Sequence, residues 1–159
     1  MIRVVHISTI APETLKDALS YIAENLRPDD RAELAATSAI PPEEAVLLSA
    51  DVSSDAWLIL DRANTPIGVF GVAPHVVPGV GVAWLLGTDG LLKEALSVAR
   101  QTAQYVQELH RDYAVLWNYV DARNALSIRW LQWAGFTVGD VLLEHGPEAR
   151  PFFMFVRHR

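Results

Sequence analysis

Hydrophobic and polar residues follow two different periods along this chain, and together they predict an α/β protein. Short runs rich in β-branched and aromatic residues predict strands. We expect strands at residues 2–7, 57–60, 67–73, 80–86, 114–120, 137–143 and 152–156. Apolar residues spaced three and four apart predict helices that begin near Pro12, Pro28, Thr88 or Asp89, and Asn124, with a short helical turn after Pro41.

The helix that follows residue 88 is expected to be long. Thr88 or Asp89 can cap it, and its apolar face is predicted to hold Leu92, Ala95, Leu96, Ala99, Ala103 and Val106. This helix joins two strands, so residues 80–86 and 114–120 should lie side by side and parallel. The second strand is nearly all apolar, which predicts that both of its faces are covered.

The element order predicts an α/β sandwich with a mixed, mostly antiparallel sheet. No repeat or linker divides residues 1–159, so we expect a single domain. Hydrophobic residues make up 51% of the chain and charged residues 20%, which excludes a disordered protein.

Charge and cysteine content exclude several classes of function. The formal charge is −6, which disfavours nonspecific nucleic-acid binding. The absence of cysteine excludes disulfides, thiolate nucleophiles and Cys-ligated zinc. The five histidines share no ligand spacing, so we expect no metal site. No apolar run is long enough to span a bilayer, and the first residues do not form a signal peptide, so we expect a cytoplasmic protein that does not bind a membrane.

The segment 84–92 joins a strand to a helix through a turn that contains Gly87 and Gly90. Free backbone N–H groups at a helix N-terminus suit a phosphate or pyrophosphate. An ordinary strand–helix connection explains the same glycines, and the carboxylate of Asp89 would repel an anion.

A second segment carries a family resemblance. Asn124 follows the strand Trp117-Asn118-Tyr119-Val120, and a helix then leads to Gly135-Phe136. This strand–Asn–helix–Gly-Phe ending resembles the GNAT superfamily of N-acetyltransferases, whose element order matches essentially the whole chain. More narrowly, the strand together with Ile128-Arg129-Trp130-Leu131 and Ala134-Gly135-Phe136 resembles small GNAT-like proteins of short-tailed bacteriophages, of the internal virion protein A type.

The resemblance implies a GNAT-like three-layer sandwich whose two central parallel strands splay apart. The cofactor would be acetyl-CoA or another acyl-CoA, with its pantetheine arm between the strands and its pyrophosphate on the turn. The implied cofactor-binding residues are Trp84, Leu85, Leu86, Gly87, Thr88, Asp89, Gly90 and Asn124. A backbone N–H of the first strand would polarise the acyl carbonyl, and an amine would attack it directly.

The chain departs from the family pattern at three positions. Gly87 stands where the family turn has Gln or Arg, and Leu92 stands where it has a small residue. Leu131 occupies the position of a tyrosine that serves many members as the general acid, and leucine cannot donate a proton.

Three residues are candidates for catalytic work, each with an ordinary alternative. Asn118 lies in an apolar strand, where its amide could bind a ligand or bridge the splayed strands. His75 titrates in the useful range but lies in a loop that could be merely exposed. Ser127 shares a helix side with Asn124 and could touch the cofactor arm or bond its own backbone. Arg123 and Arg129 could meet CoA phosphates or could be surface residues.

Two functions of different classes follow. The first is an acyl-CoA-dependent N-acyltransferase acting on an amine, either a small molecule or a host protein. The second is a GNAT-shaped phage protein without catalysis, located in the virion or bound to a host protein in the bacterial cytoplasm. The apolar residues 152–155 could form a homodimer interface, or a buried central strand.

Overall fold

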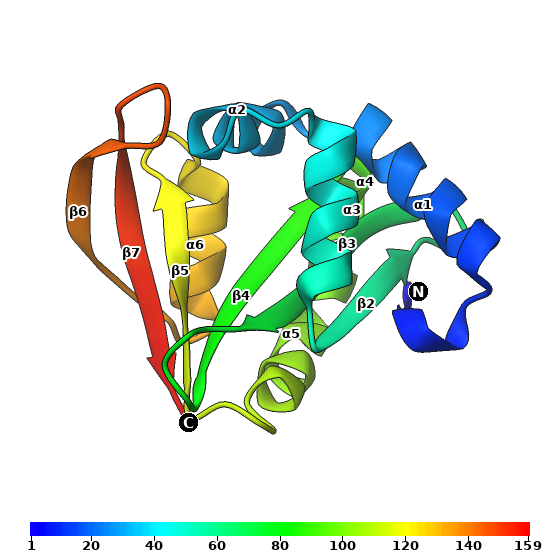
Figure 1. Ribbon diagram of the computed structural model, residues 1–159. Helices are drawn as coiled ribbons and strands as arrows, with labels where there is room; N and C mark the ends of the chain where they lie inside the picture. The colour runs from blue at the N-terminus through cyan, green and yellow to red at the C-terminus, as the bar shows by residue number, and fades with distance from the viewer.

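A seven-stranded mixed sheet runs through the centre of the computed structural model, which describes residues 1–159 (Figure 1). The strand order is β1-β2-β3-β4-β5-β7-β6. The strands are β1 (Arg3–His6), β2 (Asp55–Leu60), β3 (Pro66–Pro74), β4 (Val80–Gly87), β5 (Val115–Asp121), β6 (Thr137–His145) and β7 (Arg150–His158). The helices are the 3-10 turn η1 (Ile7–Thr9), α1 (Pro12–Glu24), α2 (Pro28–Thr37), α3 (Pro42–Val52), α4 (Gly90–Lys93), α5 (Ala95–Leu109) and α6 (Ala125–Trp133).

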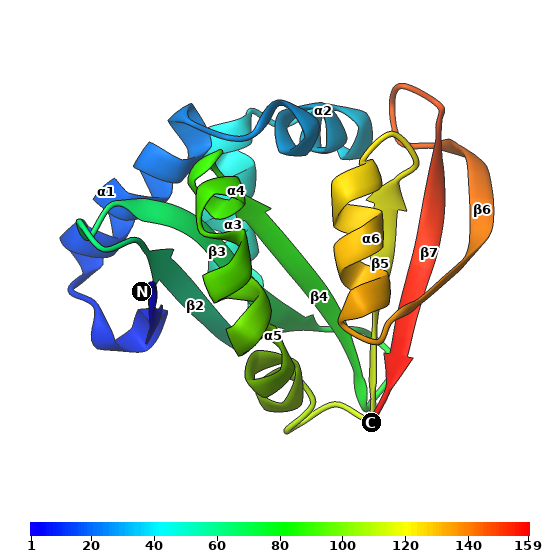
Figure 2. The same cartoon turned by 180° about the vertical axis from the view of Figure 1, so that it is seen from behind.

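Helices cover both faces of the sheet. On one face α1 and α3 pack over β2, β3 and β4, while α4, α5 and α6 lie on the opposite face (Figures 1 and 2). Proline stands at the first position of α1, α2 and α3, where its missing N–H costs no helical hydrogen bond. Residues of α1 and α3 such as Leu19, Ile22 and Val46 form one core cluster with Leu58 and Val69 of the sheet.

The prediction of a single long helix after residue 88 is wrong, because the structure has two helices there that meet at Glu94. Glu94 has φ −103° and ψ 17°, so α4 ends there and α5 starts with a new phase. The predicted apolar face is wrong at Leu92 and Leu96, which are 47% and 76% exposed, and it is confirmed at Val106, which is buried. The buried residues of α5 are Val98, Val106 and Leu109.

The parallel pairing of β4 with β5 confirms the expected crossover. The expectation that β5 is covered on both faces is wrong. Leu116 and Val120 are buried on the side of α6, but Trp117 and Tyr119 are only half-buried. No helix lies over this part of the sheet on their side (Figure 1).

The C-terminal strand β7 lies inside the sheet between β5 and β6. Phe152 and Phe155 are buried there. Of the two predictions for residues 152–155, a homodimer interface or a buried central strand, the structure shows the buried strand. The outermost strand on this side is β6.

None of the helices combines the length and the apolar character that crossing a membrane requires.

Candidate functional site

The parallel strands β4 and β5 separate after three residue pairs. The pairs are Val80 with Val115, Gly81 with Leu116 and Val82 with Trp117. Beyond them the two strands diverge toward their C-terminal ends and leave a V-shaped gap in the sheet (Figure 1). We call the space between β4 and β5 beyond Val82 and Trp117 the wedge; its presence confirms the expected splay.

The side chain of Asn118 ends the pairing between these strands. Its Nδ2 donates to the carbonyl oxygen of Ala83 at 3.0 Å, and its Oδ1 accepts from the backbone N–H of Tyr119 at 2.8 Å. The Ala83 carbonyl and the Tyr119 N–H are the groups that the next bond of a parallel ladder would join. The amide of Asn118 satisfies both, so the strands separate without leaving either group unpaired. Of the two roles expected for Asn118, the structure shows the bridge between splayed strands.

The wedge contains a cavity of about 240 Å³. Its wall is formed by Glu33, Leu34, Thr37, Ser49, Ala83, Trp84, Leu85, Leu86, Asn118, Tyr119, Val120, Ser127, Trp130, Leu131, His145 and Phe155. Peptide groups alternate in direction along a strand, and Thr88 N–H donates to Ile67 of β3. The N–H and C=O of Leu85 therefore point away from β3 and toward the wedge, where no strand pairs with them.

A second, apolar cavity of about 130 Å³ lies between the sheet and α5 and α6. It shares six lining residues with the first, namely Ala83, Trp84, Leu85, Trp130, Leu131 and Phe155. The indole of Trp130 is held at this boundary, where its Nε1 donates to Thr102 Oγ1 of α5 at 3.3 Å. The indole of Trp84 instead donates to Ser53 Oγ at 2.8 Å, just after α3.

Three N–H groups of the turn after β4, those of Gly87, Thr88 and Gly90, are engaged within the protein. Gly87 N–H donates to the carboxylate of Asp30 at 3.0 Å, and Thr88 N–H donates to the Ile67 carbonyl at 2.9 Å. Gly90 N–H donates to Thr88 Oγ1 at 3.0 Å, so the hydroxyl of Thr88 satisfies the first N–H group of α4. Asp89 makes no side-chain capping bond.

Helix α2 and the residue before it hold this turn closed. Leu26 forms a β-bridge with Thr88, and Arg27 N–H donates to the Gly87 carbonyl at 2.9 Å. The guanidinium of Arg27 makes two hydrogen bonds to Asp30, and both side chains are almost fully buried. A buried carboxylate thus occupies the hydrogen-bonding position that an anion would need at Gly87.

The same helix crosses the wide end of the wedge to reach the other side (Figure 2). Arg27 donates to Ser127 Oγ of α6 at 3.3 Å. Near the middle of α2, Glu33 accepts from Asp121 N–H at 2.6 Å through Oε1 and from Asn124 Nδ2 at 3.2 Å through Oε2. α2 is therefore bonded to the ends of both splayed strands.

Glu33 is the one Asp, Glu, Lys or Arg residue in the wall of the wedge cavity. Burial raises its pKa to about 7, against the opposing effect of the hydrogen bonds from Asp121 N–H and Asn124. The nearby carboxylates of Asp30 and Asp121 raise it further. This carboxyl group therefore titrates near neutral pH.

Asp121, Arg123 and Asn124 form a structural junction between β5 and α6. Burial alone would raise the pKa of Asp121, but the hydrogen bonds from Arg123 outweigh it and lower that pKa. Asn124 caps α6 by accepting from Ser127 N–H at 3.4 Å. Its amide is therefore committed to α6 and to Glu33, and Arg123 is paired with Asp121. Arg129 is exposed.

The predicted site residues divide into two groups. Trp84, Leu85, Leu86, Asn118 and Ser127 line the wedge cavity.

Gly87, Thr88, Asp89, Gly90 and Asn124 do not line it. His75 lies apart, with its ring edge-on to Trp117 at 5.3 Å.

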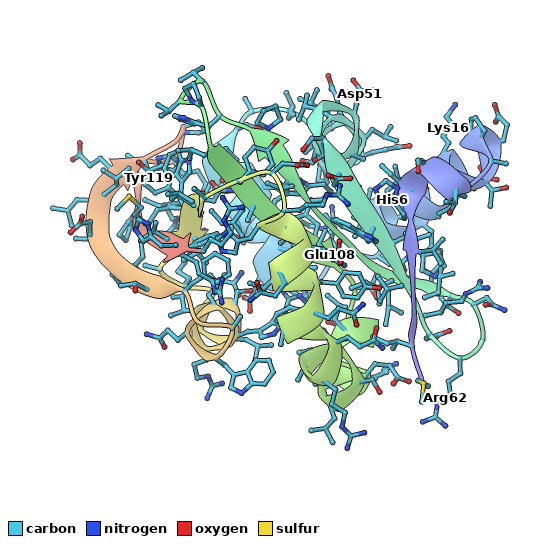
Figure 3. The ribbon with its side chains drawn as sticks, turned by 90° about the horizontal axis from the view of Figure 1, so that it is seen from below. His6, Lys16, Asp51, Arg62, Glu108 and Tyr119 are labelled. Atoms are coloured by element: carbon cyan, nitrogen blue, oxygen red, sulfur yellow. The ribbon has the colours of Figure 1, made fainter.

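Sequence reasoning missed Glu33, Asp30, Tyr119 and His145. Tyr119 lies beside β6 and far from His6 and Lys16, which belong to the other side of the molecule (Figure 3). Its ring centroid is 5.0 Å from that of His145. The half-polar strand 117–121 could have suggested Tyr119, but nothing local in 28–37 indicates that α2 reaches the wedge.

The fold is similar to that of known proteins of solved structure. No protein-family model matches the chain, and no curated protein matches it by sequence. Solved structures do match. A GCN5-related N-acetyltransferase from Kribbella flavida has a TM-score of 0.68 and 18% identity, covering 99% of this chain and 98% of that one.

Two further structures agree over their full length. The ribosomal-protein-S18-alanine N-acetyltransferase from Escherichia coli has a TM-score of 0.66 at 12% identity, covering 99% of this chain and 94% of that one. An acetyltransferase of the GNAT family from Streptococcus pneumoniae has a TM-score of 0.64 at 12% identity, covering 99% of both chains. The chain therefore has the GNAT fold, as its sequence predicted.

Proposed function

We propose that this protein is an acyl-CoA-dependent N-acyltransferase that binds an acyl thioester in the wedge and transfers the acyl group to an amine. One observation carries the proposal: β4 and β5 stop pairing at Val82 and Trp117, and the peptide groups of Leu85 face a cavity. The similarity of the fold to those three acetyltransferases supports it.

The wedge fits the amide-containing arm and the thioester of such a donor. The Leu85 N–H and C=O could bond an extended amide-containing arm as a neighbouring strand would. The same N–H could polarise a thioester carbonyl, since a fixed backbone donor stabilises developing negative charge. Acyl-CoA would supply an acyl group activated as a thioester.

The turn after β4 does not fit the diphosphate of such a donor. Asp30 bonds Gly87 N–H, and Thr88 Oγ1 bonds Gly90 N–H, so these donors are not free for a diphosphate. A β-carbon at Gly90 would lie 2.3 Å from Ile67, so this glycine is required for packing. We therefore assign the diphosphate of CoA no contact with the N–H groups of Gly87, Thr88 and Gly90, and we expect the wedge to hold the donor.

The wall of the cavity defines what the protein contributes to acyl transfer. Trp130, Leu131 and Phe155 are apolar and exclude water from the thioester. Leu131 cannot protonate a leaving thiolate, so that proton would come from solvent or from the attacking amine. The reaction would depend on positioning and on removal of a proton from the amine.

Calorimetry with two donors tests this proposal. Acetyl-CoA and S-acetylpantetheine, which lacks the nucleotide, should bind with similar affinity, because the wedge contacts only the part they share. Release of free thiol in the presence of a primary amine would report transfer. If neither compound binds at millimolar concentration, the proposal is wrong.

A second candidate function has its own supporting observation. The buried Asp30 in the anion position, together with Leu131 in the tyrosine position, favours a GNAT-fold protein without catalysis. Such a protein could be a bacteriophage virion component or a binder of a host protein, in line with the resemblance in residues 117–136. An absence of thermal stabilisation by either donor would favour it.

A further inference from the structure

We propose that Glu33 binds the ammonium group of the acceptor and then takes its proton before the amine attacks the thioester. This inference rests on the proposed acyl transfer and names a residue and an acceptor class for it. Nothing in the sequence motif of 117–136 points to Glu33, which lies more than eighty residues earlier in the chain.

The placement of Glu33 suits this role. Its side chain lies in the wall of the same cavity as Leu85 and Asn118, at the end closed by α2. Asp121 N–H and Asn124 Nδ2 each donate to one of its oxygens and so fix its orientation. A carboxylate can accept about four hydrogen bonds, so each oxygen retains a free acceptor position.

The charged neighbours of Glu33 leave it as the local site for a cation. Asp30 on α2 and Asp121 at the end of β5 are each paired with an arginine, namely Arg27 and Arg123. His145 of β6 lines the same cavity. Glu33 itself has no cationic partner and accepts only from uncharged N–H donors. Its raised pKa means that it can both hold and release a proton near pH 7.

The step balances as follows. The ammonium R–NH3⁺ gives one proton to the Glu33 carboxylate and becomes R–NH2. The amine nitrogen forms a C–N bond with the thioester carbonyl carbon, and the C–S bond breaks as the electron pair leaves with sulfur. The nitrogen loses its second proton, which the thiolate takes up, and the products are an amide and a free thiol.

The cavity also limits the acceptor. Tyr119, Trp130 and Phe155 provide aromatic and apolar surface, and the acceptor shares the volume of about 240 Å³ with the thioester arm, so only a small molecule or one side chain fits beside it. An acceptor with its own carboxylate near the amine would be repelled by Glu33. We therefore infer a compact primary amine with an apolar body.

Binding of n-butylamine to the full chain tests this inference without any thioester. At pH 8 both the butylammonium ion and the Glu33 carboxylate are charged, so calorimetry should show binding to the wild type. Glu33→Gln preserves the shape of the side chain and should weaken this binding about tenfold or more. Glu44→Gln removes the same charge from an exposed position on α3 and should bind as the wild type does.

Two further readouts separate a binding role from a structural one. Binding to the wild type should weaken as the pH falls from 8 to 6, whereas neutral n-butanol should bind wild type and Glu33→Gln equally. Where acetyl transfer to butylamine is measurable, Glu33→Gln should lower kcat about a hundredfold. A circular dichroism spectrum like that of the wild type would show that the variant folds.

Either of two results would overturn the inference: no butylammonium binding by the wild type at pH 8, or equal binding by Glu33→Gln. Failure of the proposed function is a separate result, since it would appear as absent acetyl-CoA binding while butylammonium still binds.

Discussion

Leu85 in the wedge and Gly87 at the turn after β4 lie two residues apart on the same strand, yet only the backbone groups of Gly87 are hydrogen-bonded within the protein. At Leu85 the peptide group faces a cavity and no strand pairs with it. At Gly87 both the N–H and the C=O are bonded, by Asp30 and by the backbone of Arg27. Splaying two strands and presenting an anion site are thus separable properties, and this chain combines an open wedge with a closed turn.

The contrast has a physical origin in two polar side chains. Asn118 satisfies the groups exposed where the ladder ends, and this permits the strands to diverge at little cost. Asp30 satisfies the donor at Gly87 and neutralises the buried Arg27. One side chain keeps the wedge open and the other keeps the turn closed.

The largest expected effect comes from removing Asp30. Asp30→Ala leaves the buried guanidinium of Arg27 and the N–H of Gly87 without their partner. The free energy of unfolding should fall by about 3–5 kcal/mol, measured by urea denaturation. Asp29→Ala changes an exposed carboxylate in the same first turn of α2 and should cost less than about 0.5 kcal/mol. Equal losses in the two variants would show that Asp30 does not hold the turn.

The conservative variant Asp30→Asn tests the comparison further. Its neutral amide oxygen can still accept from Gly87 N–H, but it does so more weakly than the carboxylate of Asp30. If the turn can serve as an anion site once the carboxylate is neutral, acetyl-CoA should gain affinity while S-acetylpantetheine should not. Unchanged affinity for both would show that the turn stays closed for reasons other than charge.

The next effect is a pH dependence of stability that originates in Glu33. Its pKa is about 7 in the folded protein against 4.5 ordinarily, so between these values the folded state holds a proton that the unfolded state has lost. The contribution of Glu33 to the free energy of unfolding should therefore decrease as the pH rises from 5 to 8, by up to about 3 kcal/mol.

Urea denaturation at a series of pH values checks this slope. Glu33→Gln should show little of it, and Glu44→Gln should retain it. Asp121 has a lowered pKa, so its own contribution changes only in more acidic solution. Burial lowers the pKa of His110, which contributes a slope of the opposite sign in this range. The difference between the slopes of the wild type and Glu33→Gln therefore reports Glu33, and equal slopes would contradict its raised pKa.

Much of the fold could be predicted because its signals are local. The prolines at residues 12 and 28 mark helix starts, and Asn124 and Gly135 bound α6 as expected. The segment after Pro41, predicted as a short helical turn, is instead the 11-residue helix α3. The break at Glu94 carries no proline or glycine and depends on how α4 packs, so periodicity alone merged two helices into one.

The site was predictable only where it follows the strand pattern. Leu85 and Asn118 lie on strands whose position the sequence indicates, and both line the cavity. Asp30 and Glu33 reach the site through contacts across 57 and 88 residues, and no local pattern encodes such contacts. Asp30 resembles an ordinary acidic residue in the first turn of a helix, and Glu33 resembles an ordinary acidic residue on a helix surface.

A smaller effect is expected at the point where the strands begin to separate. Asn118→Leu keeps the size of the side chain but leaves the Ala83 carbonyl and the Tyr119 N–H without partners. The free energy of unfolding should fall by about 2 kcal/mol, and the Tyr119 amide should exchange with solvent faster. Gln104→Leu, at an exposed position of α5, is the control. Slower exchange at Tyr119 would mean that the strands had closed, and the wedge would then be a consequence of Asn118 alone.

The smallest effect is expected where α2 meets α6. Ser127→Ala removes one long hydrogen bond of 3.3 Å from Arg27, whose guanidinium still keeps two bonds to Asp30. The loss of unfolding free energy should stay below about 1 kcal/mol. Donor binding should change little, because the proposed contacts to the donor arm are made by the peptide groups of Leu85.

Glu33 keeps its two hydrogen bonds from Asp121 N–H and Asn124 Nδ2 in this variant, so α2 should stay attached to the junction between β5 and α6. Hydrogen exchange in the first turn of α6 should therefore change little. A loss as large as that of Asp30→Ala would mean that the bond from Arg27 to Ser127, and not Glu33, holds α2 at this end.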